Sequence, residues 1–382
     1  MKVIKILIIV IAVVVLLPLL GYAGWLIKSG QPLEVFVVNK SMTHFRGSEN
    51  KALNNILDRK KIYTAASRTY DLRIDHYGLI WNKGDYRTKF PRLREIVSTA
   101  EKMDLIYYAD AAGILVSDLR ELKEGEADGP EYGGLNNSDY TLIREFMQLG
   151  KPIVAECSFF APPTEPLVRF NLEKLTDVYY VGWIGKYVKD LSEYPDQQMG
   201  LDWKRLYGEY TGNTWTATGP GLVLINPEAR RILVLKEGEH IRCSDGFIVT
   251  NKSGMQDYGL PGRVNYYGWF TLLHEGRNNV VSEFRLNPTE EGKVALNEFG
   301  IPETFPALIH ADDHFYYLAG DFGKSCSGGL FSKVLVLGPL FDGLRSNSKS
   351  ASRFYFSYYK PFMSRVIEDA QAIRDGEKQD GF

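Results

Sequence analysis

The first part of the chain alternates short apolar runs with amphipathic segments. Strands are predicted at residues 33–38, 70–76, 104–109 and 152–155. Apart from 70–76 these segments are apolar runs, which are typical of strands buried on both faces. Segments with apolar residues at helical spacing lie at residues 49–60, 93–102 and 139–149, the last with Ser138 as its N-cap and Gly150 at its end. This order predicts an α/β fold with a mostly parallel sheet flanked by helices.

The pattern changes near residue 176. Short predicted strands with Gly, Pro and Asn between them lie at residues 178–183, 215–218, 221–225 and 232–235. Further predicted elements are a helix at 290–299, strands at 315–319 and 334–337, and a last helix at 352–374, which Pro361 must kink or restart. We therefore expect an antiparallel β region inserted into the α/β unit or appended to it.

These patterns divide the chain into segments. We expect a membrane anchor or signal peptide at 1–28, an α/β core at 29–176, a β-rich insertion at 177–285, a return to the core with the C-terminal helix at 286–374, and a polar tail at 375–382. The main alternative architecture is a closed eight-stranded barrel, because its strands would also end in Asp and Glu residues and give the same sequence pattern.

Residues 6–27 form an apolar run of 22 residues without a charge. As a helix this run would be ~33 Å long, enough to cross a hydrocarbon core of ~30 Å. Lys2 and Lys5 precede it and only Lys28 follows closely, which places the N-terminus in the cytoplasm. The alternative is a signal peptide cleaved after the small-x-small sequence at 21–23. Either interpretation puts the bulk of the chain outside the cytoplasm, and the first makes it a single-pass periplasmic protein of the inner membrane.

Composition narrows the classes of partner. Among 382 residues, Lys and Arg total 45 and Asp and Glu total 47, so no basic field exists to hold nucleic acid. Three cysteines are too few for a disulfide scaffold; Cys243 and Cys326 could pair and leave Cys157 free. No phosphate-binding, dinucleotide-binding or zinc-binding motif is present, and we expect no cofactor.

Polar residues follow the predicted strands. They are Asn39, Asp75, Asp110, Glu156 and Asp321. Because ligands of open parallel sheets bind beyond the carboxyl ends of the strands, these positions predict a polar, acidic ligand site at one edge of the sheet.

Cys157 stands between a predicted strand and a segment that turns toward a helix, where an α/β fold can place a nucleophile. Here the chain resembles the class I glutamine amidotransferase-like group, which has a flavodoxin-like sheet and a Cys-His-Glu triad. The resemblance implies a late histidine as the base, either His310 or His314, with Asp312 in place of the glutamate. The group's Gly-x-Cys-x-Gly turn is absent, since Ala155 and Phe159 occupy the glycine positions.

Several phrases together resemble a group of membrane-anchored bacterial envelope proteins with such a domain. They are DLIYYADAAGIL, EYGGLNNSDY, GKPIVAECSFFAPPTEP, VGWIGKYVKDLS and FYYLAGDF. The resemblance implies a fold and a location, and it carries no activity.

Two further patterns suggest ligands. The run from His310 to His314 holds two histidines and two aspartates, which could ligate a metal on a helix; on a strand the histidines would be ~13 Å apart, and we expect no metal there. Trp183 and neighbouring Trp and Tyr residues suit the apolar faces of sugar rings.

Two functions follow from the sequence. The first is a non-catalytic amidotransferase-like domain that binds a glycan or an envelope protein. The second is a hydrolase of a glycan or an amide, which would use either Cys157 with His310 or His314, or Asp110 and Glu156 as an acid–base pair.

Overall fold

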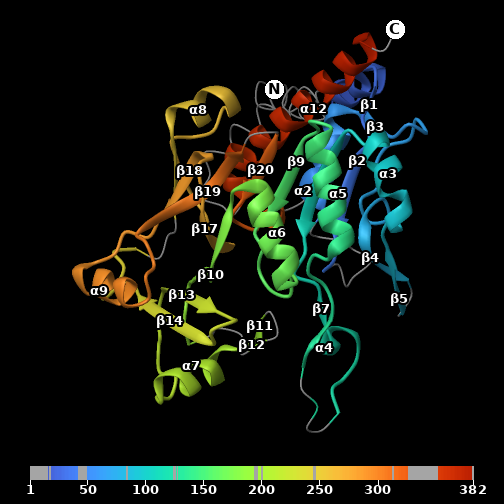
Figure 1. The fold of residues 1–382 in the computed structure, drawn as a ribbon. Coiled ribbons are helices and arrows are strands. Elements are labelled where there is room, and N and C mark those ends of the chain that lie inside the picture. Colours follow the sequence, from blue (N-terminus) through green and yellow to red (C-terminus); the bar gives the residue numbers. More distant parts are fainter. Residues whose placement is uncertain are drawn as a thin grey trace, which may run out of the picture.

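In the computed structural model, most of the chain is arranged around one large sheet (Figure 1). The residues it describes are 16, 19–41, 50–82, 85–123, 126, 128–192, 197–198, 201–243, 247–311, 314–325 and 352–380. The strand predicted at 334–337 and the residues Asp312 and Cys326 lie outside this part of the chain.

The large sheet is mixed and has ten strands. In spatial order they are β16 (Arg263–Asn265), β15 (Phe247–Thr250), β18 (Asn279–Arg285), β19 (Thr304–Ala311), β20 (Phe315–Leu318), β9 (Ile153–Glu156), β6 (Leu105–Asp110), β2 (Val35–Asn39), β4 (Tyr77–Asn82) and β5 (Asp85–Lys89). Strands β20, β9, β6, β2 and β4 are parallel to one another, and the other pairs are antiparallel.

The centre of this sheet agrees with the prediction. The three apolar runs form β2, β6 and β9, which are adjacent and parallel, with Val37 opposite Tyr107 and Tyr107 opposite Val154. Every residue of the three strands is buried, as continuous apolar runs require. The α/β class is confirmed, and the described sheet is open, ending at β16 and β5.

Two predicted strands are wrong. Residues 70–76 form a turn in which the Asp75 amide donates to the Asp71 carbonyl and the Asp71 amide donates to the Asp75 carboxylate, so the strand β4 begins only at Tyr77. Residues 215–218 are irregular, and the Trp215 indole donates to the Leu191 carbonyl instead.

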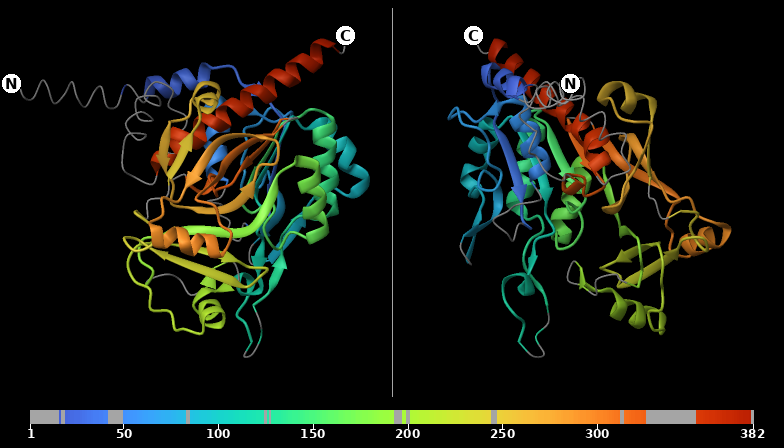
Figure 2. Two further views of the ribbon diagram at one scale, coloured as in Figure 1. Left: turned by 60° about the vertical axis from the view of Figure 1, so that its left-hand side comes forward. Right: turned by 180° about the vertical axis from the view of Figure 1, so that it is seen from behind.

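Helices cover both faces of the parallel strands (Figures 1 and 2). On one face α5 (Asn137–Gln148) packs between α3 (Ile96–Lys102) and α6 (Pro166–Thr176). On the other face α2 (Lys51–Lys60) packs against α12 (Lys360–Asp380). The resulting three layers bury the strands between two sets of helices.

Local sequence explains where these helices start and stop. In α2 the residues Ala52, Leu53, Ile56 and Leu57 form the buried face. The N-cap of α5 is Asn136, whose side chain accepts from the Ser138 amide, so the expected cap at Ser138 lies two residues too late. Gly150 follows α5 with a φ of +63°, which glycine adopts without strain.

The last helical segment runs through Pro361 without a break. It begins as α11 (Ser352–Phe354), widens into a π turn at Tyr355–Tyr359, and continues as α12. A proline ring crowds the carbonyl four residues earlier, and the wider turn lies directly before this proline.

A second, antiparallel sheet has the order β14 (Arg231–Lys236), β13 (Gly221–Asn226), β10 (Tyr179–Val188) and β17 (Trp269–His274). The helix α7 (Trp203–Thr211) packs against β14, and Trp203 lies within a small core of its own. Antiparallel β structure therefore follows residue 176 as predicted. Residues 247–285 nevertheless supply β15, β16 and β18 to the large sheet.

The remaining elements are short. They are the strand pairs β1 (Gln31–Pro32) with β3 (Ile62–Tyr63), β7 (Ile114–Leu115) with β8 (Pro130–Tyr132), and β11 (Gln197–Gln198) with β12 (Leu201–Asp202), the helices α4 (Val116–Leu119), α8 (Lys252–Tyr258) and α9 (Glu290–Glu298), and the 3-10 turns η1 (Leu93–Glu95) and η2 (Gly323–Ser325).

Residues 19–27 are helical and lie against the end of α2. Within the described part of the chain, no helix combines the length and the apolar character needed to cross a membrane. Most of the apolar run at 6–27 falls outside that part, so the membrane anchor stays a prediction.

Candidate functional site

Three loops meet at the carboxyl edge of the parallel strands around Asp110, the last residue of β6. Its Oδ1 accepts from the Ser158 hydroxyl at 2.8 Å and from the Ala112 amide at 2.9 Å, and its Oδ2 accepts from Lys324 Nζ at 2.9 Å. Burial alone would raise the pKa of Asp110, but Lys324 and these hydrogen bonds outweigh burial and hold the pKa below its ordinary value. Asp110 is therefore ionised, and each of its carboxylate oxygens already accepts a hydrogen bond from the protein.

Glu156, the last residue of β9, lies beside this group and is 2% exposed. Its Oε1 accepts from the Tyr107 hydroxyl at 2.6 Å, and both oxygens lie 3.1 Å from the Gly323 amide nitrogen. Burial, and then the charge of Asp321, raises the pKa of Glu156 well above its ordinary value. Burial therefore disfavours the charged form of this carboxyl group, and its bonds to the Gly323 amide fix the turn η2.

A glycine is required at position 323. A Cβ atom built on Gly323 would lie 2.8 Å from the Tyr107 hydroxyl, closer than a real side chain could come. The absence of a side chain lets the backbone amide approach Glu156, and this approach brings the next residue, Lys324, to Asp110.

Lys324 and Asp321 form the outer side of the cluster. The Lys324 ammonium lies 3.3 Å from Asp321 Oδ2, and the lysine side chain is 43% exposed. Although burial lowers it, the pKa of Lys324 is raised well above its ordinary value by Asp110 and then Asp321. The Asp321 amide donates to the Trp269 carbonyl at 2.9 Å, and the Lys186 ammonium lies 5.2 Å from the centre of the Trp269 ring. We call Asp110, Glu156, Cys157, Asp321 and Lys324 the edge cluster.

Cys157 is half-buried in the edge cluster, and the Tyr317 hydroxyl donates to its carbonyl at 3.2 Å. Burial, followed by the charges of Asp321 and Asp110, raises the pKa of the Cys157 thiol well above its ordinary value. A cysteine nucleophile reacts as the thiolate, and this environment opposes that form.

The two candidate histidines lie elsewhere. His310, on β19, is opposite Tyr316 of β20, which is opposite Val154, three residues before Cys157 along the sheet. Its Nδ1 lies 2.9 Å from the Tyr258 hydroxyl, and its ring stacks on Tyr316. The His314 carbonyl accepts from the Ile153 amide, which places His314 at the amino end of β9. The fold therefore does not assemble a Cys-His pair with either histidine.

Three other predicted ligand residues also lie outside the cluster. Asn39 is opposite Asp110 in the sheet register, but its buried side-chain amide donates to Asn50 Oδ1 at 3.1 Å and to no member of the cluster in the described contacts. Asp75 precedes β4, two strands from β6, and forms a bidentate ion pair with Arg68. Trp183, on β10, is 4% exposed and packs edge-on against Phe299, so its ring belongs to the interior.

A buried ion pair behind the cluster was not foreseen from the sequence. Lys40 Nζ donates at 2.7 Å to both Asp139 Oδ2 and the Gly134 carbonyl, and neither side chain of the pair is more than 2% exposed. The Lys40 amide donates to the Asp110 carbonyl at 2.8 Å, so this ion pair supports the strand end that carries Asp110. The one feature of the sequence that could have indicated this ion pair is the position of Lys40 directly after a buried strand.

No metal site is found among the described residues, where no group of three or more His, Cys, Asp or Glu side chains converges. His310 lies near the end of β19 and His314 directly precedes β20, and these two strands are antiparallel neighbours.

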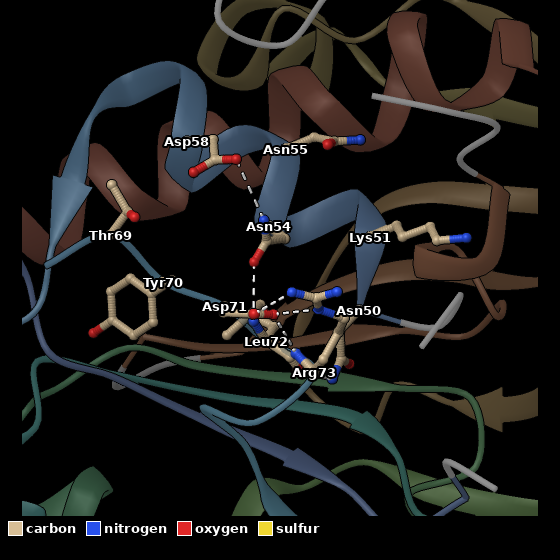
Figure 3. A pocket seen from close by; sticks show the side chains of 10 residues that line it. All are labelled: Asn50, Lys51, Asn54, Asn55, Asp58, Thr69, Tyr70, Asp71, Leu72 and Arg73. Carbon is tan, nitrogen blue, oxygen red and sulfur yellow. Dashed lines mark hydrogen bonds and ion pairs between the residues drawn. The ribbon is translucent and has the colours of Figure 1, made fainter. Parts of the chain in front are cut away.

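A polar pocket of about 330 Å³ lies between α2 and the turn before β4 (Figure 3). Its polar groups are largely bonded to one another: Asn54 accepts from the Leu72 amide, and Arg73 pairs with Asp71. It is lined by Asn50, Lys51, Asn54, Asn55, Asp58, Thr69, Tyr70, Asp71, Leu72 and Arg73, none of them in the edge cluster.

Comparisons with known proteins give a coarse likeness. No protein-family model matches this chain, and no curated protein does. A crystal structure of a ThuA-like protein from Parabacteroides merdae matches with a TM-score of 0.34 and 11% identity, over 80% of this chain and 88% of that one. Another, from Bacteroides uniformis, matches with a TM-score of 0.37 and 7% identity, over 86% of this chain and 96% of that one. A likeness at this level carries no argument about activity, ligand or partner.

Proposed function

We propose that this protein is a binding module which holds a neutral, polyhydroxylated ligand such as a glycan at the edge cluster, without using Cys157 as a nucleophile. The observation that carries the proposal is the Asp321–Lys324 pair, in which the lysine side chain is 43% exposed and the aspartate side chain 12%, with the Asp321 amide bonded to the Trp269 carbonyl. A carboxylate acceptor next to an ammonium donor suits neighbouring hydroxyl groups, and an indole ring suits the apolar face of a sugar.

The charges at the rim favour a neutral ligand. Lys186 and Lys324 supply two positive charges, and Asp110 and Asp321 supply two negative ones. Burial, and then the charge of Asp321, raises the pKa of Glu156 well above its ordinary value, which disfavours a third negative charge there. A charged ligand would give the site a net charge when bound. A neutral ligand with hydroxyl groups can bond to both the ammonium donors and the carboxylate acceptors of the site.

A hydrolase that uses Asp110 and Glu156 is the second candidate. One observation favours it: the pKa of Glu156 is raised by burial and that of Asp110 is lowered by Lys324 and its hydrogen bonds despite burial, the directions that a general acid and a general base require. Both carboxyl groups, however, point at protein donors and are 4% and 2% exposed as residues, so a substrate would have to displace those bonds. Binding without hydrolysis is therefore the preferred function.

The proposal places this module at the outer face of a bacterial inner membrane, anchored by residues 6–27. The support is the uncharged run itself and the exposure of Leu19, Leu20 and Leu26 at its end. Protease added to intact spheroplasts should digest the region after Lys28, and its full protection would contradict this location.

Binding is tested with the full-length protein in a detergent without a sugar headgroup. Maltose, cellobiose and chitobiose serve as probes in saturation-transfer NMR. We expect transfer to at least one of them, lost in Lys324→Met and Trp269→Leu and kept in the control Tyr210→Leu, whose exposed ring belongs to α7. No transfer to any probe would contradict glycan binding, and release of monosaccharide by the wild type would favour the hydrolase.

A further inference from the structure

Lys61 closes the C-terminal end of the helix at residues 19–27. Its ammonium donates to the carbonyls of Trp25 at 3.1 Å, Leu26 at 2.8 Å and Lys28 at 2.5 Å. The last carbonyls of a helix lack intrahelical partners, and a positive charge is favourable there. One buried side chain thus satisfies three carbonyls at the end of this helix.

Lys61 is itself held rigidly. It follows α2 in the left-handed conformation, with a φ of +60°, and is 8% exposed. Its carbonyl accepts from the Gln31 amide at 3.0 Å, and its ammonium lies 5.1 Å from the centre of the Trp25 ring. The Trp25 indole donates to the Asp58 carbonyl at 2.9 Å, so the helix and the end of α2 are joined from both sides. We call these contacts the Lys61 clamp.

Only a narrow stripe of the helix faces the domain. Gly21 and Trp25, one turn apart, are buried, whereas the described Leu and Ile side chains near them are 54% to 84% exposed. These exposed side chains are Leu16, Leu19, Leu20, Leu26 and Ile27. Several exposed large apolar side chains on one short helix indicate a nonaqueous neighbour. The uncharged run in the sequence that includes this helix is long enough for that neighbour to be a lipid bilayer.

We infer that the Lys61 clamp fixes the membrane anchor to the domain, with the exposed leucine face of the helix against lipid. This inference rests on the proposed anchor. Lys61 lies between α2 and β3, at the amino end of β2, whereas the edge cluster lies at the carboxyl end of the parallel strands. Figure 2 shows the blue helix at the opposite end of the sheet from the β7–β8 loop that follows Asp110. The clamp thus holds the edge cluster at a fixed position, remote from the point where the anchor joins.

The test uses the full-length protein in vesicles of phosphatidylethanolamine and phosphatidylglycerol, treated with proteinase K. Cleavage at residues 28–33 releases the domain into solution, and the clamp should make it slow in the wild type. Lys61→Met should release the domain about tenfold faster or more, because three charge-assisted hydrogen bonds are lost. Lys60→Met is the matched control, since its side chain pairs with Glu368 at the surface. Trp25→Phe, which removes the bond to Asp58 and leaves a smaller ring beside Lys61, should give a smaller acceleration than Lys61→Met. If Lys61→Met fails to fold, an unchanged release rate in Trp25→Phe would refute the clamp.

Failure of the clamp and failure of the anchor give different results. If alkaline carbonate does not extract the wild type and Lys61→Met is released no faster than Lys60→Met, the clamp is refuted and the anchor stands. If carbonate extracts the wild type, both the anchor and the lipid-facing assignment of the leucine face are refuted.

Discussion

The Lys324 ammonium lies 2.9 Å from Asp110 Oδ2, although 214 residues separate them in the chain. Asp110 ends β6 and Lys324 belongs to the turn after β20, and the two strands lie on either side of β9. Their contact therefore forms only when residues 105 to 324 have folded. An intact edge cluster depends on this contact.

Replacing Lys324 with methionine should destabilise the fold. Asp110, with a side chain 6% exposed, would keep only neutral donors, so we expect the free energy of unfolding to fall by about 1–2 kcal/mol. The loss should be smaller than for a fully buried pair because Lys324 is partly exposed. Urea denaturation measures it. Lys293→Met, which breaks an exposed pair with Glu290, is the control and should leave stability unchanged; equal losses would contradict the assignment.

The raised pKa of Glu156 predicts a pH dependence of stability. The folded protein holds a proton that the unfolded chain releases above about pH 4.3, so the contribution of Glu156 is present below that pH and is lost as the pH rises toward its folded pKa. The wild type should therefore lose stability relative to Glu156→Gln, by up to about 1.4 kcal/mol per pH unit. Denaturation of both proteins between pH 4 and pH 8 tests this, and parallel curves would refute it.

The thiol of Cys157 should be a poor nucleophile. In the native protein, alkylation of Cys157 by iodoacetamide should be slower at pH 8 than in urea, and its rate should still rise above the ordinary thiol pKa of about 8.5. Peptide mass spectrometry reports the rate for this residue alone. Cys157→Ser should cost no more than about 1 kcal/mol of stability. Rapid, pH-independent alkylation near neutrality would mean a stabilised thiolate and would revive the enzymatic alternative.

The Lys40–Asp139 pair should show strong coupling. Lys40→Met alone leaves a carboxylate that is 0% exposed without its cation, and we expect a loss of about 3–5 kcal/mol. The double variant Lys40→Met with Asp139→Asn should lose less than Lys40→Met alone, because it removes the unpaired charge. A denaturation cycle of the four proteins measures the coupling, and additive losses would contradict a direct pair.

Local patterns predicted the centre of the fold well. The apolar runs that became β2, β6 and β9 could be recognised because strands buried on both faces need side chains of one kind throughout. Because ligands bind beyond the carboxyl ends of parallel strands, Asp110, Glu156 and Asp321 were predicted to lie at one edge of the sheet. In the structure all three lie at that edge.

The remaining features depend on contacts between distant segments. Nothing near residue 310 reveals that β19 pairs with β20 in a register that sends His310 toward Tyr258 and away from Cys157. Residues 70–76 form a turn and not the predicted strand because Asp75 bonds to Arg68 and to the Asp71 amide. The raised pKa of Glu156 arises from burial and then from the charge of Asp321, and no local window of sequence contains these contacts.

The place of β20 in the sheet also bears on how the protein is made. Tyr317 of β20 and Cys157 after β9 are 160 residues apart, so a ribosome working at about 5–20 residues per second completes β9 roughly 8–30 s before β20 emerges. During that interval one edge of β9 presents unpaired amides and carbonyls beside bare apolar side chains. The nascent chain should therefore need a chaperone until translation passes residue 318, and a product that terminates earlier should aggregate or be degraded.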